Sequence, residues 1–349
     1  MNYVPALDGV RAIAVLTVIV FHTFYDRFPG GYIGVDLFFV LSGYLITSNL
    51  LAEWENCGRI DMPRFWLRRV RRLAPGLYVF LACLAFAALF TKIRNDVLEA
   101  IGFAATYTMN WARAFELGPD TVLAHTWSLA IEQQFYLIWP IVLSALLAKA
   151  GRRGAPLAIL ALILAVLGWR IALEAMHAPG TRIYNGFDTR ADALLIGCLL
   201  AFLPNLPRTW SPWLFWSASL VGYLFVLFGN NGQWSLIWGF TAFAAVAAIW
   251  IAAAASAVTG QFAHTLLTLE PLVAIGRISY GMYLWHYPIL LVLKSLDLPS
   301  GVTINLELLL TISVAAASFH WIERPFLTKG SRSIVRYGQA LEPVASTVS

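Results

Sequence analysis

Long hydrophobic stretches dominate the chain, and short polar or basic segments separate them. The stretches lie near residues 9–26, 34–52, 73–91, 97–113, 125–147, 155–174, 190–204, 211–229, 234–256, 272–293 and 304–322. Most are long enough to cross the hydrocarbon core of a membrane, roughly 30 Å thick, as helices. The pattern predicts an all-α, polytopic membrane protein.

Basic residues predict how the chain is threaded, because cytoplasmic loops of membrane proteins are rich in Lys and Arg. Residues 59–72, 149–153 and 324–336 are basic. All three regions can be cytoplasmic only if one hydrophobic stretch between the first and second regions does not cross the membrane. The 97–113 stretch contains the most polar residues, so we expect it to be re-entrant or interfacial. About ten transmembrane helices then remain, with both termini in the cytoplasm.

Composition agrees with a membrane protein and limits the other classes. Of 349 residues, 59% are hydrophobic and 12% are charged, which is unlike a soluble domain. The net charge of +5 comes from residues at helix ends, so we expect no nucleic-acid partner. The three cysteines lack metal or disulfide spacing, and no metal site is expected.

The domain organisation is expected to be simple. The first hydrophobic stretch has no cleavage site and should be retained as a span. Residues 1–326 should form one membrane-embedded domain, and residues 327–349 should be a mobile cytoplasmic tail. Oligomeric state is open at this stage.

Ionisable residues within the hydrophobic stretches are the first candidates for function, because they are costly at membrane depth. Arg11 and His22 are eleven residues apart, so they share a helix face and lie about 16 Å apart along the axis. His22 could act as base and then acid near neutral pH, or it could be a structural histidine. Asp36 could orient His22 as a triad carboxylate does, or cap its own helix.

A second candidate is the basic segment FWLRRVRRLAP, which contains Arg68, Arg69, Arg71 and Arg72. Arginine suits bidentate binding of phosphate. The alternative is that the segment anchors the helix at anionic lipid headgroups.

A third candidate is HTWSLAIEQQFYLIWP, in which His125, Ser128 and Glu132 recur at i, i+3 and i+7. This spacing places them on one helix face, and the predicted topology puts them at the depth of His22. They could bind a sugar hydroxyl or polarise the base. Equally, they could form a polar clamp between helices.

Two further polar groups favour structural interpretations. Asp188, Arg190 and Asp192 lie within about one turn, where opposite charges can neutralise one another. Ser279, Tyr283 and His286 share one face of a predicted helix. His286 could be a second polar wall of a site or a hydrogen-bonded core histidine.

Taken in order, these segments resemble the membrane-bound acyltransferase family 3. The resemblance rests on Arg11 with His22 and on GVDLFFVLSGYLI, FWLRRVRRLAP, TWSLAIEQQFYLIWP, GRISYGMYLWHYP and IERPF, within residues 3–326. It implies a ten-helix core, a cytoplasmic acyl-CoA donor and an acceptor hydroxyl reached from the outer side. It also implies that His22 is essential, that Arg11 is its paired basic residue, and that Arg69 and Arg72 form the family's RxxR pattern.

The chain departs from the family pattern at two positions. Ala130 stands where a second Ser is usual, and Gln133 stands where a second Glu is usual. The residues that supply the hydroxyl and the carboxylate of the site are therefore assigned less directly than the enzyme class. Some family members carry an added periplasmic SGNH-type domain, which we do not expect here. Acceptor handover would then take place in the membrane core or through another protein.

We therefore hypothesise an O-acyltransferase of the bacterial inner membrane, without a permanently bound cofactor. It would move an acetyl or short acyl group from acyl-CoA, as co-substrate, to a glycan, glycolipid or other hydroxylated acceptor. The CoA phosphates would bind Arg68, Arg69, Arg71 and Arg72, and Arg11 is also expected to contribute to donor binding. His22 would deprotonate the acceptor while Asp36 or Glu132 holds the imidazole.

Other mechanisms and functions are compatible with the same residues. An acyl-histidine intermediate on His22 would be nucleophilic catalysis. A transporter or flippase for a lipid-linked sugar would also line its path with polar residues, although no inverted repeat is visible in the sequence. A non-catalytic scaffold is a third alternative, against which the intact Arg11, His22 and RxxR elements argue.

Overall fold

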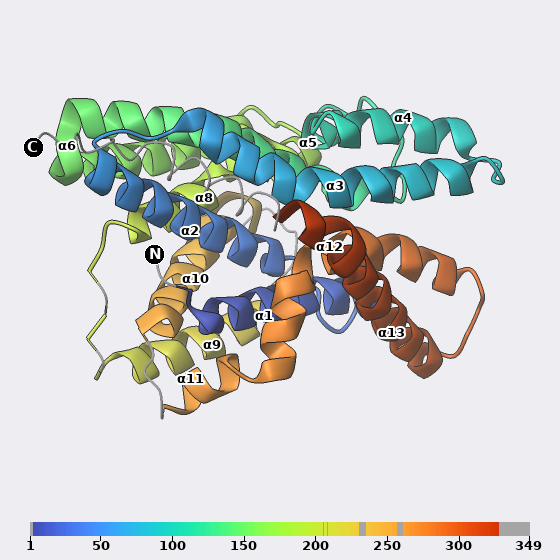
Figure 1. Cartoon of the computed structure of the whole chain (residues 1–349). Coiled ribbons are helices and arrows are strands. Elements are labelled where there is room, and N and C mark those ends of the chain that lie inside the picture. The colour runs from blue at the N-terminus through green and yellow to red at the C-terminus, as the bar shows by residue number, and fades with distance from the viewer. Residues whose placement is uncertain (1–2, 205, 208, 230–234, 257–260, 328–349) are drawn as a thin grey trace, which may run out of the picture.

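The computed structural model describes residues 3–327, except for 205, 208, 230–234 and 257–260. Helices and connecting turns make up this part of the chain, and it contains no β-strand (Figure 1). The predicted all-α architecture is therefore confirmed. The tail predicted for residues 327–349 lies, apart from Leu327, outside the described residues.

The helices follow one another with short connections. In chain order they are α1 (Pro5–Thr23), α2 (Ile33–Cys57), α3 (Met62–Ala88), α4 (Arg94–Ala105), α5 (Met109–Ala114), η1 (Ala124–Thr126), α6 (Trp127–Ala175), α7 (Gly180–Asn185), α8 (Phe187–Leu200), α9 (Ser211–Phe228), η2 (Ser235–Gly239), α10 (Phe240–Ser256), α11 (Phe262–Leu267), α12 (Glu270–Lys294), α13 (Ser300–Ser318) and η3 (Phe319–Glu323).

Within the described chain, seven helical segments are long and apolar enough to cross a membrane. They contain α1, α2, α3, α6, α9, α10 and α13. The ten predicted crossings correspond to these seven with α6 counted twice, together with α8 and α12. A polytopic membrane protein is confirmed, whereas the number ten and the side of the termini stay predictions.

Two features explain why α6 and α8 differ from the expected spans. Gly151 interrupts α6 with a φ of 64° and a ψ of 179°, so the predicted stretches 125–147 and 155–174 are two helical segments joined at this kink. Helix α8 has 14 residues, about 21 Å of helix, which is shorter than the hydrocarbon core.

The 97–113 stretch forms two short helices instead of one span. Helix α4 has 12 residues and α5 has 6, so neither reaches across the membrane. Tyr107, between them, has a φ of 54°, a left-handed conformation that ends the helix. Helix α4 lies beside α3 (Figure 1), where Tyr78 donates a hydrogen bond to the carbonyl of Ala105 at 3.1 Å. This arrangement is what we expect of a re-entrant or interfacial segment.

The arginine segment belongs to α3, which begins at Met62, well before the predicted hydrophobic stretch at 73. The Asp61 side chain accepts a hydrogen bond from the Arg64 amide at 3.0 Å, and Pro63 occupies the first turn. Both are strong helix-start signals. Hydrophobicity alone missed this start, because arginine is a good helix former that lowers hydropathy.

Glycines allow the central helices to approach closely. A Cβ atom on Gly43 of α2 would meet the backbone oxygen of Leu194 in α8, and one on Gly197 would meet the oxygen of Val40. Gly276 of α12 is in the same position against the backbone of Asp8 in α1. Close backbone contact of this kind is how membrane helices pack. The α1, α2, α8 and α12 helices therefore form a tight framework for the polar residues between them.

Candidate functional site

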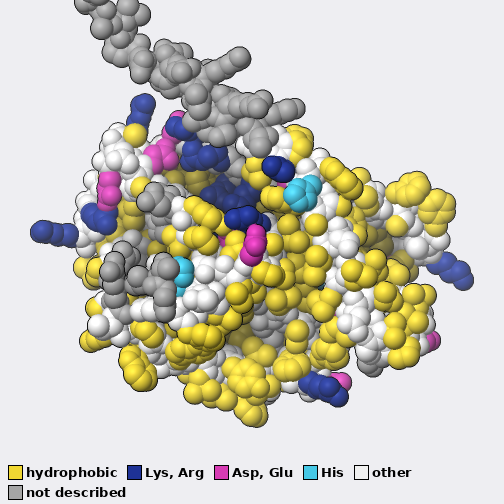
Figure 2. Space-filling model, turned by 60° about the horizontal axis from the view of Figure 1, so that its bottom comes forward, with side chains coloured by type: hydrophobic (Ala, Val, Ile, Leu, Met, Phe, Trp, Pro, Cys, Tyr) yellow, Lys and Arg dark blue, Asp and Glu magenta, His cyan; other side chains and the backbone are white. Residues whose placement is uncertain are grey.

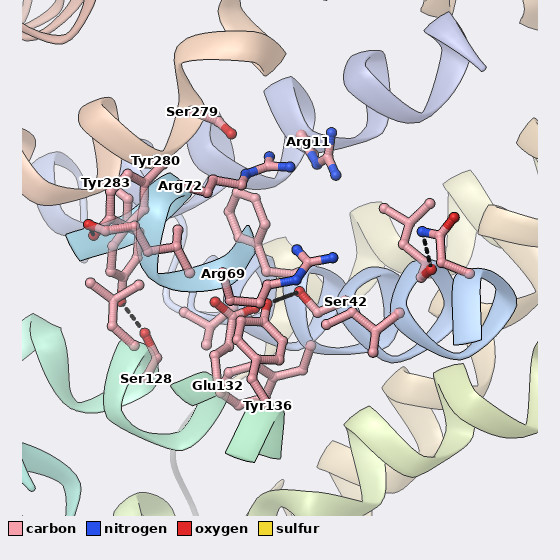
Figure 3. Close-up of a pocket in the computed structure, with 18 residues that line it drawn as sticks. Arg11, Ser42, Arg69, Arg72, Ser128, Glu132, Tyr136, Ser279, Tyr280 and Tyr283 are labelled. Atoms are coloured by element: carbon pink, nitrogen blue, oxygen red, sulfur yellow. Dashed lines mark hydrogen bonds between the residues drawn. The ribbon is translucent and has the colours of Figure 1, made fainter. Parts of the chain in front are cut away.

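A cavity of about 200 Å³ lies between α1, α2, α3, α6 and α12. Its polar lining includes Arg11, Arg69, Arg72, Glu132 and Tyr136 (Figure 3). We call it the arginine cavity. Three guanidinium groups against one lining carboxylate make it cationic, and guanidinium groups bind phosphate well. Figure 2 shows Lys and Arg side chains gathered around a hollow on one face of an otherwise largely hydrophobic surface.

The arginine run divides into two pairs. Arg69 and Arg72 line the cavity from adjacent turns of α3, whereas Arg68 and Arg71 do not. Arg68 lies at the surface with its nitrogen 3.5 Å from the Glu53 carboxylate. Arg69 is instead held between aromatic rings, 5.5 Å from the centroid of Phe65 and 5.4 Å from that of Tyr136. Of the four arginines predicted to bind phosphate, Arg69 and Arg72 alone are placed to contact a ligand in this cavity.

Arg11 of α1 lines the same cavity as the RxxR pair. Its guanidinium contacts the Asp8 carboxylate at 2.5 Å. Asp8 is buried and also accepts a hydrogen bond from the Tyr3 hydroxyl at 2.7 Å. Arg11 is therefore fixed in direction while still lining the cavity.

Glu132 lies in the arginine cavity and is not close to His22. Its carboxylate accepts a hydrogen bond from Ser42 at 2.6 Å, and Ser42 accepts one from Tyr136 at 3.2 Å. The hypothesis that Glu132 holds the His22 imidazole does not fit these contacts. The reason is the helix rise: Glu132 is seven residues beyond His125, about 10 Å along the axis. Residues on one face of a helix can therefore lie at different depths in the membrane.

A second cavity, of about 380 Å³, contains the predicted catalytic histidine. We call it the histidine cavity. His22 and His125 line it together with the aromatic residues Trp127, Tyr184 and Tyr287. Arg113, Asp120, Thr181 and Asn185 add polar groups to the wall. Aromatic faces and mixed polar groups are the usual lining of a site for a small polar organic ligand.

Hydrogen bonds assign the protons of His22 and His286. His286 Nδ1 is 2.7 Å from the Tyr283 carbonyl oxygen, which can only accept, so Nδ1 carries the hydrogen. In neutral His286 the Nε2 atom is then an acceptor. It lies 3.2 Å from His22 Nδ1, which is also 3.0 Å from the Val18 carbonyl oxygen. His22 Nδ1 is therefore the donor, and the lone pair of neutral His22 is on Nε2.

His22 is the histidine of this group that keeps a basic nitrogen for a ligand. Its Nε2 atom makes no hydrogen bond to any described residue, and the side chain lines the cavity. His125 differs, since its two ring nitrogens each face a carbonyl oxygen at 3.1 Å, from Val122 and Leu284. His286 is buried. The geometry therefore favours His22 as the base.

Asp36 has a partner other than His22. Its carboxylate is 2.7 Å from the guanidinium of Arg190 in α8, and both side chains are buried. Arg190 lies over the ring of Phe240 at 3.4 Å and also contacts Tyr184 and Trp127. The hypothesis that Asp36 orients His22 is replaced by a structural role. Asp36 neutralises an arginine behind the aromatic wall of the histidine cavity.

The acidic and basic residues near 190 form ion pairs, but they do not neutralise one another as expected, since each pairs with a residue of another segment. Arg170 pairs with Asp192 at 2.6 Å, with both side chains fully buried. Thr241 hydrogen-bonds to both members of that pair. Asp188 pairs with Arg182 at 2.5 Å. Residues one turn apart thus point to different neighbours, which sequence spacing does not reveal.

Ser128 separates the two cavities together with Tyr283. Its hydroxyl is 2.6 Å from the Tyr283 hydroxyl, and both residues line the arginine cavity. Trp127, the preceding residue, lines the histidine cavity. The predicted Ser128 therefore contributes to the boundary between the cavities. Sequence reasoning missed Ser42 and Tyr136 as cavity residues, although Tyr136 follows Glu132 by one helical turn, a detectable signal.

Comparisons with known proteins agree with this arrangement of residues. The acyltransferase 3 family model, described as an acyltransferase domain, matches residues 4–321. The chain is 35% identical to the O-acetyltransferase OatA of Staphylococcus aureus strain MRSA252, covering 99% of this chain and 61% of the relative. It is 36% identical to the putative peptidoglycan O-acetyltransferase YrhL of Bacillus subtilis, covering 96% and 56%.

A third relative is the peptidoglycan O-acetyltransferase OatA of Listeria monocytogenes, 35% identical over 94% of this chain and 56% of the relative. The chain thus spans less than two thirds of the length of these three bacterial proteins. No solved structure matches the chain. The family match covers every residue that lines the two cavities. The chain therefore belongs to the acyltransferase 3 family of multi-pass membrane proteins.

Proposed function

We propose that this chain is a membrane O-acetyltransferase that uses acetyl-CoA or a short acyl-CoA as donor and His22 as general base. The observation that carries the proposal is that the Nε2 lone pair of His22 accepts no hydrogen bond from any described residue and lies in the histidine cavity, which adjoins the cationic arginine cavity. The acceptor we propose is a hydroxyl of peptidoglycan or another bacterial surface glycan, which follows the names of the relatives.

Donor binding is assigned to the arginine cavity. Arg11, Arg69 and Arg72 supply the charge for the CoA phosphates. Arg11 and His22 lie on the same helix, α1, so their axial separation is about 16 Å. An extended pantetheine arm spans a distance of this order. Acyl-CoA is a co-substrate in this scheme, and the phosphates and the thioester occupy opposite ends of one path.

The transfer itself requires one base that later acts as an acid. His22 Nε2 accepts the proton of the acceptor hydroxyl as its oxygen attacks the thioester carbonyl. The C–O ester bond forms, the C–S bond breaks, and the imidazolium returns the proton to the CoA thiolate. His22 Nδ1–H keeps its bonds to Val18 and His286 throughout. These neutral acceptors stabilise the imidazolium in place of the expected carboxylate.

The test is acyl-CoA turnover by purified protein in nanodiscs with peptidoglycan fragments as acceptor. We expect His22→Ala to lower ester formation by at least 100-fold, the lower range for loss of a general base. His320→Ala, at an exposed histidine outside both cavities, is the matched control and should keep wild-type turnover. Unchanged transfer in His22→Ala would refute the assignment. Movement of a lipid-linked sugar without acyl-CoA consumption would support a transporter instead.

A further inference from the structure

The boundary between the two cavities is one side chain thick at Tyr283. This residue of α12 lines the arginine cavity, on the opposite side of the view in Figure 3 from Arg11. Its ring centroid is 5.6 Å from that of His125 and 5.5 Å from that of His286. His125 lines the histidine cavity, and His286 bonds to His22. Tyr283 therefore lies between the cavity assigned to the donor and the proposed base, His22.

Two hydrogen bonds hold the Tyr283 side chain in this position. Its hydroxyl donates to the His125 carbonyl oxygen at 2.8 Å, which uses its only proton. Ser128 must then donate to the Tyr283 hydroxyl, at 2.6 Å. Both partners come from the segment that begins α6, so these bonds connect α12 to η1 and α6. All three residues are buried.

We propose that Tyr283 is a specificity-determining residue that limits the length of the acyl group. This inference rests on the proposed donor and base. An acyl group carried from the arginine cavity to His22 must pass the Tyr283 ring, and the arginine cavity has only about 200 Å³ in all. An acetyl group has one methyl beyond the carbonyl. Each further methylene has to occupy space that the Tyr283 ring fills.

Tyr280 provides a matched control on the same helix. It lines the same cavity, and its hydroxyl donates to the Leu73 carbonyl oxygen at 2.8 Å. It makes no ring contact with His125 or His286, in contrast to Tyr283. Truncating Tyr280 enlarges the arginine cavity away from the boundary. Truncating Tyr283 enlarges it at the boundary.

The experiment compares acetyl-CoA with butyryl-CoA as donors to peptidoglycan fragments, using the purified 349-residue chain in nanodiscs. The readout is the ratio of kcat/KM for butyryl-CoA to that for acetyl-CoA. We expect Tyr283→Ala to raise this ratio at least tenfold, since methylenes in a pocket discriminate at that level. Tyr283→Phe, which keeps the ring, should stay within about threefold of wild type. Tyr280→Ala should do the same.

The outcomes separate this inference from the proposed function. Absence of acetyl transfer by wild-type protein would refute the donor or acceptor assignment. Normal wild-type transfer with an unchanged ratio in Tyr283→Ala would overturn the role of Tyr283 alone. Tyr283→Leu carries the same expectation and replaces the alanine variant if that protein does not accumulate. An equal rise of the ratio in Tyr280→Ala would also overturn the inference, because enlarging the arginine cavity at any position would then be enough to raise it.

Discussion

Replacing Asp36 by Asn tests whether this carboxylate acts through Arg190 or through His22. The side chains of Asp36 and Arg190 are 0% and 1% exposed, and their charged atoms are 2.7 Å apart. The variant leaves the buried guanidinium of Arg190 without a counter-charge. The Nε and Nη1 atoms of Arg190 already lack a hydrogen-bond partner. Breaking one side of a buried pair costs about 3–5 kcal/mol. At about 2 °C per kcal/mol, the expected fall in Tm is about 8 °C.

The double variant Asp36→Asn with Arg190→Met is the informative control. It removes the buried charge and keeps an unbranched apolar side chain against the rings of Phe240 and Tyr184. Losing the cation–π contact costs about 2 kcal/mol, so about half of the lost stability should return. Thermal unfolding in one detergent measures this, alongside acyl transfer by the folded fraction. An Asp36→Asn protein with wild-type Tm and no transfer would refute the structural role.

Two further predictions concern the donor and the base. Arg69→Ala should raise the KM for acyl-CoA about tenfold, because a hydrogen bond to a charged group is worth about 1.5–3 kcal/mol. Arg68→Ala at the surface should leave the KM within twofold of wild type. Steady-state kinetics with both variants measures this, and equal effects would contradict the assignment. His286→Ala should lower kcat about fivefold, because it removes the acceptor for His22 Nδ1. His286→Gln should recover part of the lost kcat. A fully active alanine variant would refute the proton assignment.

Features within a single helix could be predicted from the sequence. Arg11 and His22 share α1, and Arg69 and Arg72 face one cavity from adjacent turns, as helical periodicity requires. The 97–113 stretch also forms no single long helix, as its polar residues indicated. Each of these depends only on backbone geometry and local composition.

Contacts between helices could not be predicted in the same way. The partner of Asp36 is 154 positions away, and nothing in its own segment distinguishes Arg190 from His22 as that partner. The topology predicted from charge places Glu132 at the depth of His22 together with His125, but the rise along α6 puts Glu132 in the other cavity. Lateral packing decides partners, and glycine contacts such as that of Gly43 set this packing.

In the proposed mechanism, the position of Arg11 and His22 on one helix sets the distance between the donor phosphates and the base. A separation set by helical rise cannot adjust to the ligand, because α1 is a continuous helix from Pro5 to Thr23. Its backbone is also fixed against α12 at Gly276 and α2 at Gly34. Adaptation to different acyl groups must therefore come from the side chains between the two ends. Tyr283, hydrogen-bonded to Ser128 and to the His125 carbonyl, stands at that point.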